Sequence, residues 1–156
     1  MSDLPYRAAA AIMLLNAAGK VWVGRRIDTT AEAWQMPQGG LDGDEDPEAG
    51  ALRELEEETG ITPDKIEVVA RASRTFDYDL PEELIGKVWK GRYRGQRQTW
   101  FLMRFLSDDA DVRIDTAEPE FCAWRWVEPA ALPELIVPFK RKLYEDVLAE
   151  FRDRIE

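Results

Sequence analysis

The sequence contains no histidine among its 156 residues. This absence excludes histidine-based catalytic triads, zinc sites with imidazole ligands and acid/base catalysis by an imidazole. A metal ion bound to this chain must therefore be held by oxygen ligands, which favours magnesium, manganese or calcium.

Cysteine and long apolar runs are also scarce. The single cysteine, Cys122, cannot form an internal disulfide, which fits a reducing cytoplasm, although many secreted proteins with few cysteines share this property. The apolar run from Ala8 to Leu15 is far shorter than a membrane span, and the charges of Asp3 and Arg7 cancel in the segment before it. We therefore expect a cytoplasmic protein with no signal peptide, no membrane contact and no disulfide-linked partner.

Basic residues are outnumbered by acidic ones. Lysine and arginine total 21 against 31 aspartates and glutamates, which gives a formal net charge of -10. The whole molecule should repel a polyanion. A nucleotide or nucleic-acid partner would therefore need a local basic patch or bridging cations.

The pattern of apolar runs and turn residues predicts an α/β fold in a single domain over residues 1–156. One helix is well marked, because Asp46 is a good N-cap, Pro47 suits the first helical position, and Gly60 ends the pattern. Apolar residues at four-residue steps predict a second, amphipathic helix over 138–155. Strands are predicted for residues 8–15, 21–26, 34–36, 65–76, 98–106 and 121–127. This order suggests a mixed sheet covered by helices on both faces.

Three glutamates stand on one face of the first predicted helix. Glu54, Glu57 and Glu58 are spaced i, i+3 and i+4, so their carboxylates lie within one turn and repel one another. A solvated acidic helix face could tolerate this repulsion. Leu55 faces the opposite side, however, and Gly50 lies one turn before Glu54, which indicates a site that needs close backbone approach. A divalent cation would convert the repulsion into coordination.

These glutamates belong to a longer pattern. Gly39 is followed after five residues by Glu45, and after seven more by the run Arg53 to Ile61, which reads Arg-Glu-Leu-Glu-Glu-Glu-Thr-Gly-Ile. The pattern matches the signature of the Nudix hydrolases at every required position, so the chain resembles this family. The resemblance implies a Nudix-type α/β/α sandwich with a mixed central sheet, and hydrolysis of a nucleoside diphosphate linked to another group.

Further matches across most of the chain resemble one branch of the family, the RNA pyrophosphohydrolases and dinucleoside polyphosphate hydrolases. They are Pro5-Tyr6-Arg7, Trp34 to Gly40, Tyr78 to Pro81, Gly95 to Phe101, Glu120-Phe121 with Trp124-Arg125-Trp126, and Phe139-Lys140. Aromatic strands are more often core than ligand contacts, so this assignment depends on the order and spacing of the matches. Relatives often carry serine where this chain has Ala33, so a hydroxyl contact with substrate is not expected at that position.

By this resemblance the metal ligands are the Gly39 carbonyl and the carboxylates of Glu54, Glu57, Glu58 and Glu120. The ion is expected to be magnesium, with manganese as a substitute. Taken alone, Glu120 would be an unremarkable surface glutamate. Glu57 is the first choice for the base that removes a proton from water, and Glu120 is the second. Carboxylates around shared metal ions titrate as a group, so a pH profile alone would not identify this base.

Arg53 and Glu45 are expected to support these ligands. Arg53 lies one turn before Glu57 and can orient that carboxylate through a charge-assisted hydrogen bond. Glu45 is expected to anchor the loop between Gly39 and the helix through hydrogen bonds. Arg53 is therefore counted with the catalytic residues.

The resemblance also implies a surface for binding nucleotides. Tyr78 and Phe139 correspond to nucleobase contacts, although both could instead be hydrophobic packing. Direct contacts with phosphate are expected from Arg7, Arg26 and Lys140. The segment 86–104 is basic and contains no acidic residue, so it is expected to steer longer RNA.

The leading interpretation is a magnesium-dependent pyrophosphohydrolase. Its substrate would be an RNA 5′-triphosphate, with release of pyrophosphate, or a dinucleoside polyphosphate such as diadenosine tetraphosphate. The alternatives are a pyrophosphatase acting on ADP-ribose or another nucleoside-diphosphate sugar, and a non-catalytic nucleotide sensor. The matches at 95–101 and 139–140 argue against the first alternative, and the intact glutamate set argues against the second.

Overall fold

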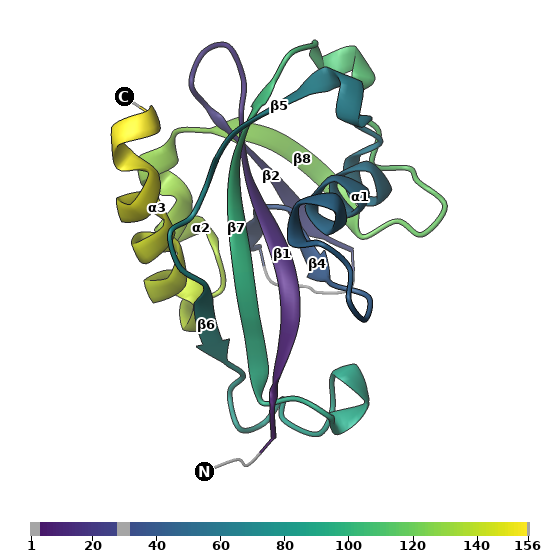
Figure 1. Cartoon of the computed structure of the whole chain (residues 1–156), viewed down its shortest axis with the longest axis vertical. Helices are drawn as coiled ribbons and strands as arrows, with labels where there is room; N and C mark the ends of the chain where they lie inside the picture. Colours follow the sequence, from purple (N-terminus) through teal and green to yellow (C-terminus); the bar gives the residue numbers. More distant parts are fainter. Residues whose placement is uncertain (1–3, 28–31, 156) are drawn as a thin grey trace.

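The computed structural model describes residues 4–27 and 32–155, which form a mixed sheet and three α-helices (Figure 1). The strands are β1 (Tyr6–Leu15), β2 (Val21–Arg26), β3 (Trp34–Gln35), β4 (Gln38–Gly40), β5 (Ile66–Arg71), β6 (Phe76–Asp79), β7 (Gly95–Phe105) and β8 (Phe121–Val127). The helices are α1 (Pro47–Thr59), α2 (Leu132–Leu135) and α3 (Arg141–Ile155). In the described part of the chain, no helix is long and apolar enough to cross a membrane.

The sheet has one parallel pair at its centre. Strands β1 and β7 run parallel from the pair Tyr6↔Gly95 to the pair Leu15↔Arg104. The path through the sheet is β3-β2-β1-β7-β5, and β4, β6 and β8 pair with β1, β7 and β2 respectively. All of these other pairings are antiparallel. The predicted mixed sheet is confirmed, and β1 and β2 form an antiparallel hairpin within it.

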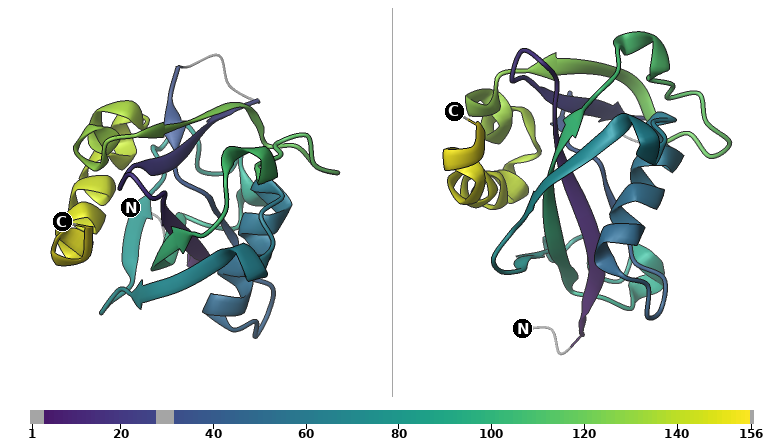
Figure 2. Two further views of the ribbon diagram at one scale, coloured as in Figure 1. Left: turned by 90° about the horizontal axis from the view of Figure 1, so that it is seen from above. Right: turned by 45° about the horizontal axis from the view of Figure 1, so that its top comes forward.

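Helices cover both faces of this sheet. In Figures 1 and 2, α1 lies on one side of β1 and β7, and α2 with α3 lies on the other. Strand alternation supplies both cores, because Met13 packs in the cluster that includes residues of α3, whereas Ile12 and Leu14 pack in the cluster that includes residues of α1. Strand β1, which was predicted from the apolar run, therefore contributes side chains to two hydrophobic cores, one on each face of the sheet. This arrangement confirms the α/β/α layering.

Helix α1 begins and ends at the predicted residues. The side chain of Asp46 accepts a hydrogen bond from the backbone N–H of Ala49 at 3.1 Å, and Pro47 occupies the first helical position. Gly60 ends the helix in a left-handed conformation with φ 73°, which glycine adopts without strain. These caps fix which turn of α1 carries the glutamates.

Several element boundaries differ from the sequence-based expectation. Gly39 and Gly40 lie outside the strand predicted over 34–36, but they belong to β4 and pair with Ala10 and Ala9 of β1. The strand expected over 65–76 is two strands, because the chain leaves β7 after Arg71 and returns to it at β6. A 3-10 turn over Pro138–Lys140 precedes α3, so Lys140 lies just before that helix. The short helix α2 was not predicted.

Candidate active site

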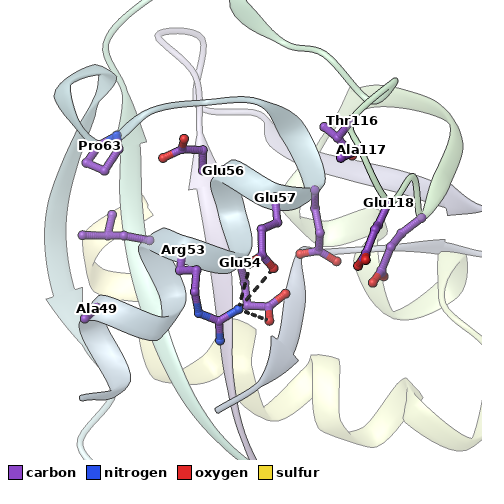
Figure 3. A pocket seen from close by; sticks show the side chains of 12 residues that line it. Ala49, Arg53, Glu54, Glu56, Glu57, Pro63, Thr116, Ala117 and Glu118 are labelled. Carbon is purple, nitrogen blue, oxygen red and sulfur yellow. Dashed lines mark hydrogen bonds and ion pairs between the residues drawn. The ribbon is translucent and has the colours of Figure 1, made fainter. Parts of the chain in front are cut away.

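Helix α1 places the three predicted glutamates between the sheet and solvent. Glu54 and Glu58 are 9% and 2% exposed, whereas the side chain of Glu57 is 57% exposed. Figure 3 shows Glu56 pointing away from Glu54 and Glu57, as helical spacing requires. The helix face expected from the i, i+3, i+4 pattern is therefore present.

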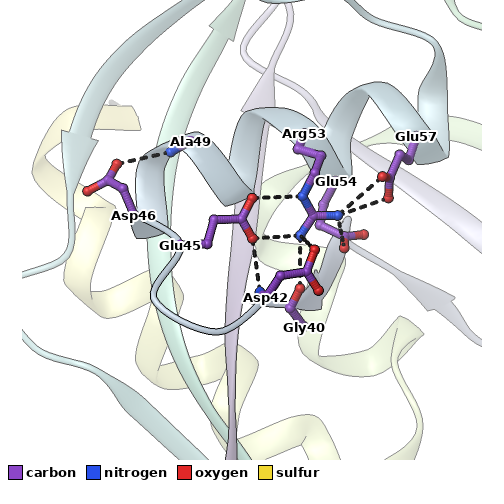
Figure 4. A network of polar contacts seen from close by, with 8 residues as sticks. All are labelled: Gly40, Asp42, Glu45, Asp46, Ala49, Arg53, Glu54 and Glu57. Carbon is purple, nitrogen blue, oxygen red and sulfur yellow. Dashed lines mark hydrogen bonds and ion pairs between the residues drawn. The ribbon is translucent and has the colours of Figure 1, made fainter.

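Arg53 links the carboxylates of Glu54 and Glu57 to the loop that precedes α1 (Figure 4). Its Nε and Nη2 atoms donate to the two oxygens of Glu45 at 2.8 Å each, and Nη2 also donates to the carbonyl of Gly40 at 3.1 Å. Its Nη1 atom donates to Glu54 at 2.9 Å and to Glu57 at 3.1 Å. Hydrogen bonding to Arg53 lowers the pKa of Glu45 to about 2. The expected contact between Arg53 and Glu57 and the expected anchoring by Glu45 are both observed.

Glu58 is a buried carboxylate without a hydrogen-bond donor. Within residues 4–27 and 32–155, neither of its side-chain oxygens has a hydrogen-bond partner, although the residue is 2% exposed. Burial raises the pKa of Glu58 well above its usual value, and the charges of Glu120 and Glu54 raise it further. A buried carboxylate is unfavourable unless a positive charge or donors compensate it. A divalent cation held by oxygen ligands would supply that compensation, so the residues present fit such an ion.

Two glycines allow the sheet to approach these groups closely. A Cβ atom at Gly39 would lie 2.1 Å from the carboxylate carbon of Glu54, and one at Gly40 would lie 2.2 Å from the guanidinium of Arg7. Both distances are impossible for real atoms, so a larger residue would displace Glu54 or Arg7. The backbone of Gly39 thus lies directly beside a predicted ligand. Gly50 behaves similarly, because its Cβ would lie 2.3 Å from Leu41 of the loop.

Glu120 reaches the same region from the residue before β8. Its carboxylate pairs with Arg26 at 3.6 Å, and its backbone oxygen accepts a hydrogen bond from the N–H of Ile27 at 2.9 Å. Burial raises the pKa of Glu54, and the charges of Glu57 and Glu120 add to this effect. Within residues 4–27 and 32–155, no group of three or more acidic or cysteine side chains is already arranged as a finished metal site.

Two hollows meet at Glu54 and Glu120, which line both of them. One, of about 870 Å³, runs along α1 and is lined by further carboxylates, namely Glu56, Glu57, Glu58 and Glu118 (Figure 3). The other, of about 540 Å³, is lined by all five predicted substrate contacts, Arg7, Arg26, Tyr78, Phe139 and Lys140. An acidic hollow thus adjoins a basic and aromatic one.

The two predicted nucleobase residues differ in exposure. Tyr78 is 7% exposed and belongs to the core next to α3, whereas Phe139 is 38% exposed. Their ring centroids are 6.0 Å apart, and Lys140 Nζ lies 4.8 Å from the centroid of the Tyr78 ring. Burial lowers the pKa of Lys140 to about 8, and the charge of Arg26 contributes to this effect. Phe139 is therefore the more accessible of the two rings, and Tyr78 is the more buried.

Sequence reasoning missed several residues that line the two hollows. They are Gln35, Leu84, Val88 and Trp89 in the basic hollow and Thr116 and Glu118 in the acidic one. Except for Gln35, these residues lie in segments without a repeating pattern, so no periodic signal could have identified them. The basic segment 86–104 is only partly as expected, because Arg94, Arg97 and Arg104 pair with acids of the neighbouring strands, Asp79, Asp77 and Glu67.

Comparison with known proteins agrees with this geometry. The model of the NUDIX domain matches residues 5–147. RNA pyrophosphohydrolase of Sphingopyxis alaskensis is 56% identical over 95% of this chain and 94% of its own length. RNA pyrophosphohydrolase of Novosphingobium aromaticivorans is 55% identical over 99% of this chain and 97% of its own length.

Solved structures share the fold at lower identity. Dihydroneopterin triphosphate pyrophosphohydrolase of E. coli is 18% identical with a TM-score of 0.70, covering 91% of this chain and 96% of that one. An Ap4A hydrolase of C. elegans in a binary complex is 21% identical with a TM-score of 0.66, covering 92% and 96%. The sequence matches and the shared fold lead to one assignment: the chain belongs to the Nudix family of hydrolases.

Proposed function

We propose that this hydrolase is a magnesium-dependent pyrophosphohydrolase that removes pyrophosphate from RNA 5′-triphosphate ends, and that it also accepts dinucleoside polyphosphates such as diadenosine tetraphosphate. The names of its relatives, RNA pyrophosphohydrolase at 51% to 56% identity in the first four matches, support the RNA substrate. The Ap4A hydrolase among the structural neighbours agrees with the dinucleotide substrate at the level of the fold.

One observation carries this proposal. The carboxylate of Glu58 is buried, accepts no hydrogen bond from the described residues, and lines an acidic hollow that meets a basic and aromatic hollow at Glu54 and Glu120. A cation would neutralise the carboxylates of the first hollow, and a polyphosphate attached to a base would match the cations and aromatic rings of the second. Neither hollow alone would distinguish a metal-dependent nucleotide hydrolase from a structural acidic cluster.

The metal would be held by the carboxylates of Glu54, Glu57, Glu58 and Glu120 and by the carbonyl of Gly39. Nudix hydrolases generally need a divalent ion, and hard carboxylate ligands favour magnesium, with manganese as a substitute. When bound, the ion neutralises charge on the phosphate oxygens and activates the attacking water.

The remaining roles belong to side chains of this chain. Glu57 accepts the proton of the attacking water, because its exposed carboxylate lies in the acidic hollow and is oriented by Arg53. Glu120 is the second candidate for this base. Arg7, Arg26 and Lys140 bind phosphate oxygens that the metal does not reach. Phe139, with Tyr78 behind it, stacks against a base.

A side-by-side rate comparison tests the proposal. Initial rates with magnesium should be measured on triphosphorylated RNA, diadenosine tetraphosphate and ADP-ribose, with Glu57→Gln as the inactive control. We expect pyrophosphate release from RNA and cleavage of the dinucleotide, both far above cleavage of ADP-ribose. A preference for ADP-ribose would assign the alternative function, and binding of all three without turnover would indicate a nucleotide sensor.

A further inference from the structure

The segment 80–94 between β6 and β7 forms one wall of the basic hollow. Its ends are joined by a hydrogen bond from the N–H of Leu80 to the carbonyl of Arg94 at 2.8 Å. Leu84, Val88 and Trp89 line the hollow and also pack against the core on the α3 side. This segment, named here the rim loop, is therefore a compact and anchored part of the substrate site.

The rim loop carries three cations that no acid neutralises. Lys87, Lys90 and Arg92 are exposed and form no ion pair with any other residue in the described part of the chain. Arg94, at the end of the loop, contrasts with them because it pairs with Asp79 at 3.0 Å. The acids of the loop itself, Glu82 and Glu83, lie together at its start and are also exposed. Positive charge is thus concentrated in the second half of the loop.

The same half of the loop adopts a backbone conformation that side chains usually avoid. Trp89 and Lys90 are consecutive non-glycine residues with φ values of 50° and 59°, and in the described residues no other non-glycine residue has a positive φ. Such conformations are unfavourable and tend to occur at functional sites. Here Trp89 packs near Arg7, whose guanidinium lies 5.3 Å from the ring centroid, while Lys90 stays exposed.

We propose that the rim loop binds the RNA chain beyond its 5′ end, with Lys87, Lys90 and Arg92 contacting backbone phosphates. The inference rests on the proposed function, because it assumes that the 5′-triphosphate occupies the adjoining hollow. Charge complementarity supports this occupant, since the molecule has a net charge of -10 and an RNA chain needs a local path of unpaired cations. A dinucleoside polyphosphate has no further backbone phosphates, so the loop favours RNA over dinucleotides.

The test removes the three charges and varies the substrate. The variant combines Lys87→Gln, Lys90→Asn and Arg92→Gln, with asparagine chosen because it tolerates a left-handed backbone. For a triphosphorylated RNA of about twelve nucleotides, KM should rise about tenfold and the slope of log KM against log salt should fall by about 2, at roughly 0.7 per phosphate contact. KM for diadenosine tetraphosphate should stay at the wild-type value.

Two further variants sharpen the comparison. Lys20→Gln, Arg152→Gln and Arg154→Gln together remove the same charge at sites that do not line the hollow, and should leave KM for RNA unchanged. Glu82→Gln with Glu83→Gln should lower KM for RNA, because it removes negative charge from the loop. If the triple substitution in the loop lowers the melting temperature, the double glutamine variant at Glu82 and Glu83 still tests the inference.

The possible outcomes separate this inference from the proposed function. Equal increases in KM for RNA and dinucleotide would mean that the loop only shapes the hollow, and an unchanged KM for RNA would show that the RNA chain does not touch it. Either result overturns the inference while wild-type turnover on triphosphorylated RNA still supports the proposed function. Absence of wild-type turnover on that RNA would instead overturn both.

Discussion

Three carboxylates at this site lie close together although their negative charges repel one another. Glu54, Glu58 and Glu120 approach one another closely enough that the charges of the first and third raise the pKa of the buried second. Arg53 compensates Glu54 and Glu57, but among the described residues no hydrogen-bond donor compensates Glu58. Substitution of Glu58 should therefore lower activity and raise the stability of the metal-free protein, whereas substitution of the exposed Glu57 should lower activity with little effect on the fold.

Glu57→Gln should lower kcat by at least about 10², because it removes the proposed base and a charge from the metal site. The fold should persist, since the side chain is 57% exposed and its hydrogen bonds go to Arg53 on the same helix. Steady-state kinetics with a circular dichroism melt checks both statements. Glu56→Gln is the matched control and should be nearly silent, because that side chain points away from the ligand face. Near-normal turnover of folded Glu57→Gln would remove Glu57 from the mechanism.

Glu58→Gln should stabilise the metal-free protein near neutral pH while abolishing activity. The pKa of Glu58 is raised by folding, so between its unfolded value of 4.5 and its higher folded value the native state binds more protons. Stability of the wild-type protein therefore falls as pH rises through that window, and the neutral amide avoids this loss. Melting temperatures in EDTA across pH, repeated with magnesium, would measure it. A less stable variant in EDTA, or equal stabilisation of both proteins by magnesium, would contradict this account.

The contacts of individual residues could be predicted from the sequence where both partners lie in one helix, because the motif sets their separation along the chain. The contact of Arg53 with Glu57 follows from a separation of four residues, and the structure shows it at 3.1 Å. The burial of Glu58 could not be predicted, because it depends on how α1 packs against the sheet. Glu118 gave no signal either, since it lies in a loop that meets α1 only after folding.

At the scale of elements, strand β6 and the 3-10 turn before α3 place two aromatic rings in different environments. Tyr78 on β6 is part of the core, so Tyr78→Ala should leave a cavity and destabilise the protein by about 3 to 5 kcal/mol. Phe139 in the turn is partly exposed, so Phe139→Ala should raise KM for RNA with a small change in melting temperature. For Tyr78, burial therefore favours the packing role over the base contact that the family resemblance implies.

Kinetics and thermal melts of both variants test this division. Tyr78→Phe is the appropriate control, because it keeps the ring and should preserve most of the stability. An unchanged KM for Phe139→Ala would show that the exposed ring is not a base contact. A stable Tyr78→Ala variant with a raised KM would instead restore the role in base binding that the sequence indicates for Tyr78.

Elements with strong local signals were predictable, and elements that depend on tertiary contacts were not. The cap Asp46, the first-turn Pro47 and the terminal Gly60 set the bounds of α1 locally. Strand β4 is different, because glycines have low strand propensity, and here their lack of a Cβ atom leaves room for Glu54 and Arg7. The break before β6 likewise depends on a distant residue, since Glu150 of α3 accepts a hydrogen bond from the N–H of Ser73 at 2.7 Å.

For the whole molecule, folding separates charges that the sequence intermixes. Arg7, Arg26 and Lys140 come from β1, β2 and the turn before α3, yet they line one hollow of a protein with a net charge of -10. The sequence predicted that a local basic patch was needed, and the family resemblance named its members. The pairing of Arg94, Arg97 and Arg104 with acids on adjacent strands could not be foreseen, because it depends on strand register.

Arg26→Ala and Lys140→Ala should raise KM for triphosphorylated RNA and weaken its salt dependence, each lowering the slope of log KM against log salt by about 0.7. Lys140 is the cleaner probe, because Arg26 also pairs with Glu120 at 3.6 Å and its loss can disturb a proposed ligand. The magnesium concentration that gives half-maximal kcat should therefore be unchanged in Lys140→Ala. Arg152→Ala removes the same charge from the last turn of α3 and should leave both quantities at their wild-type values. Salt slopes for Arg26→Ala and Lys140→Ala that match that control would show that neither residue touches the phosphates.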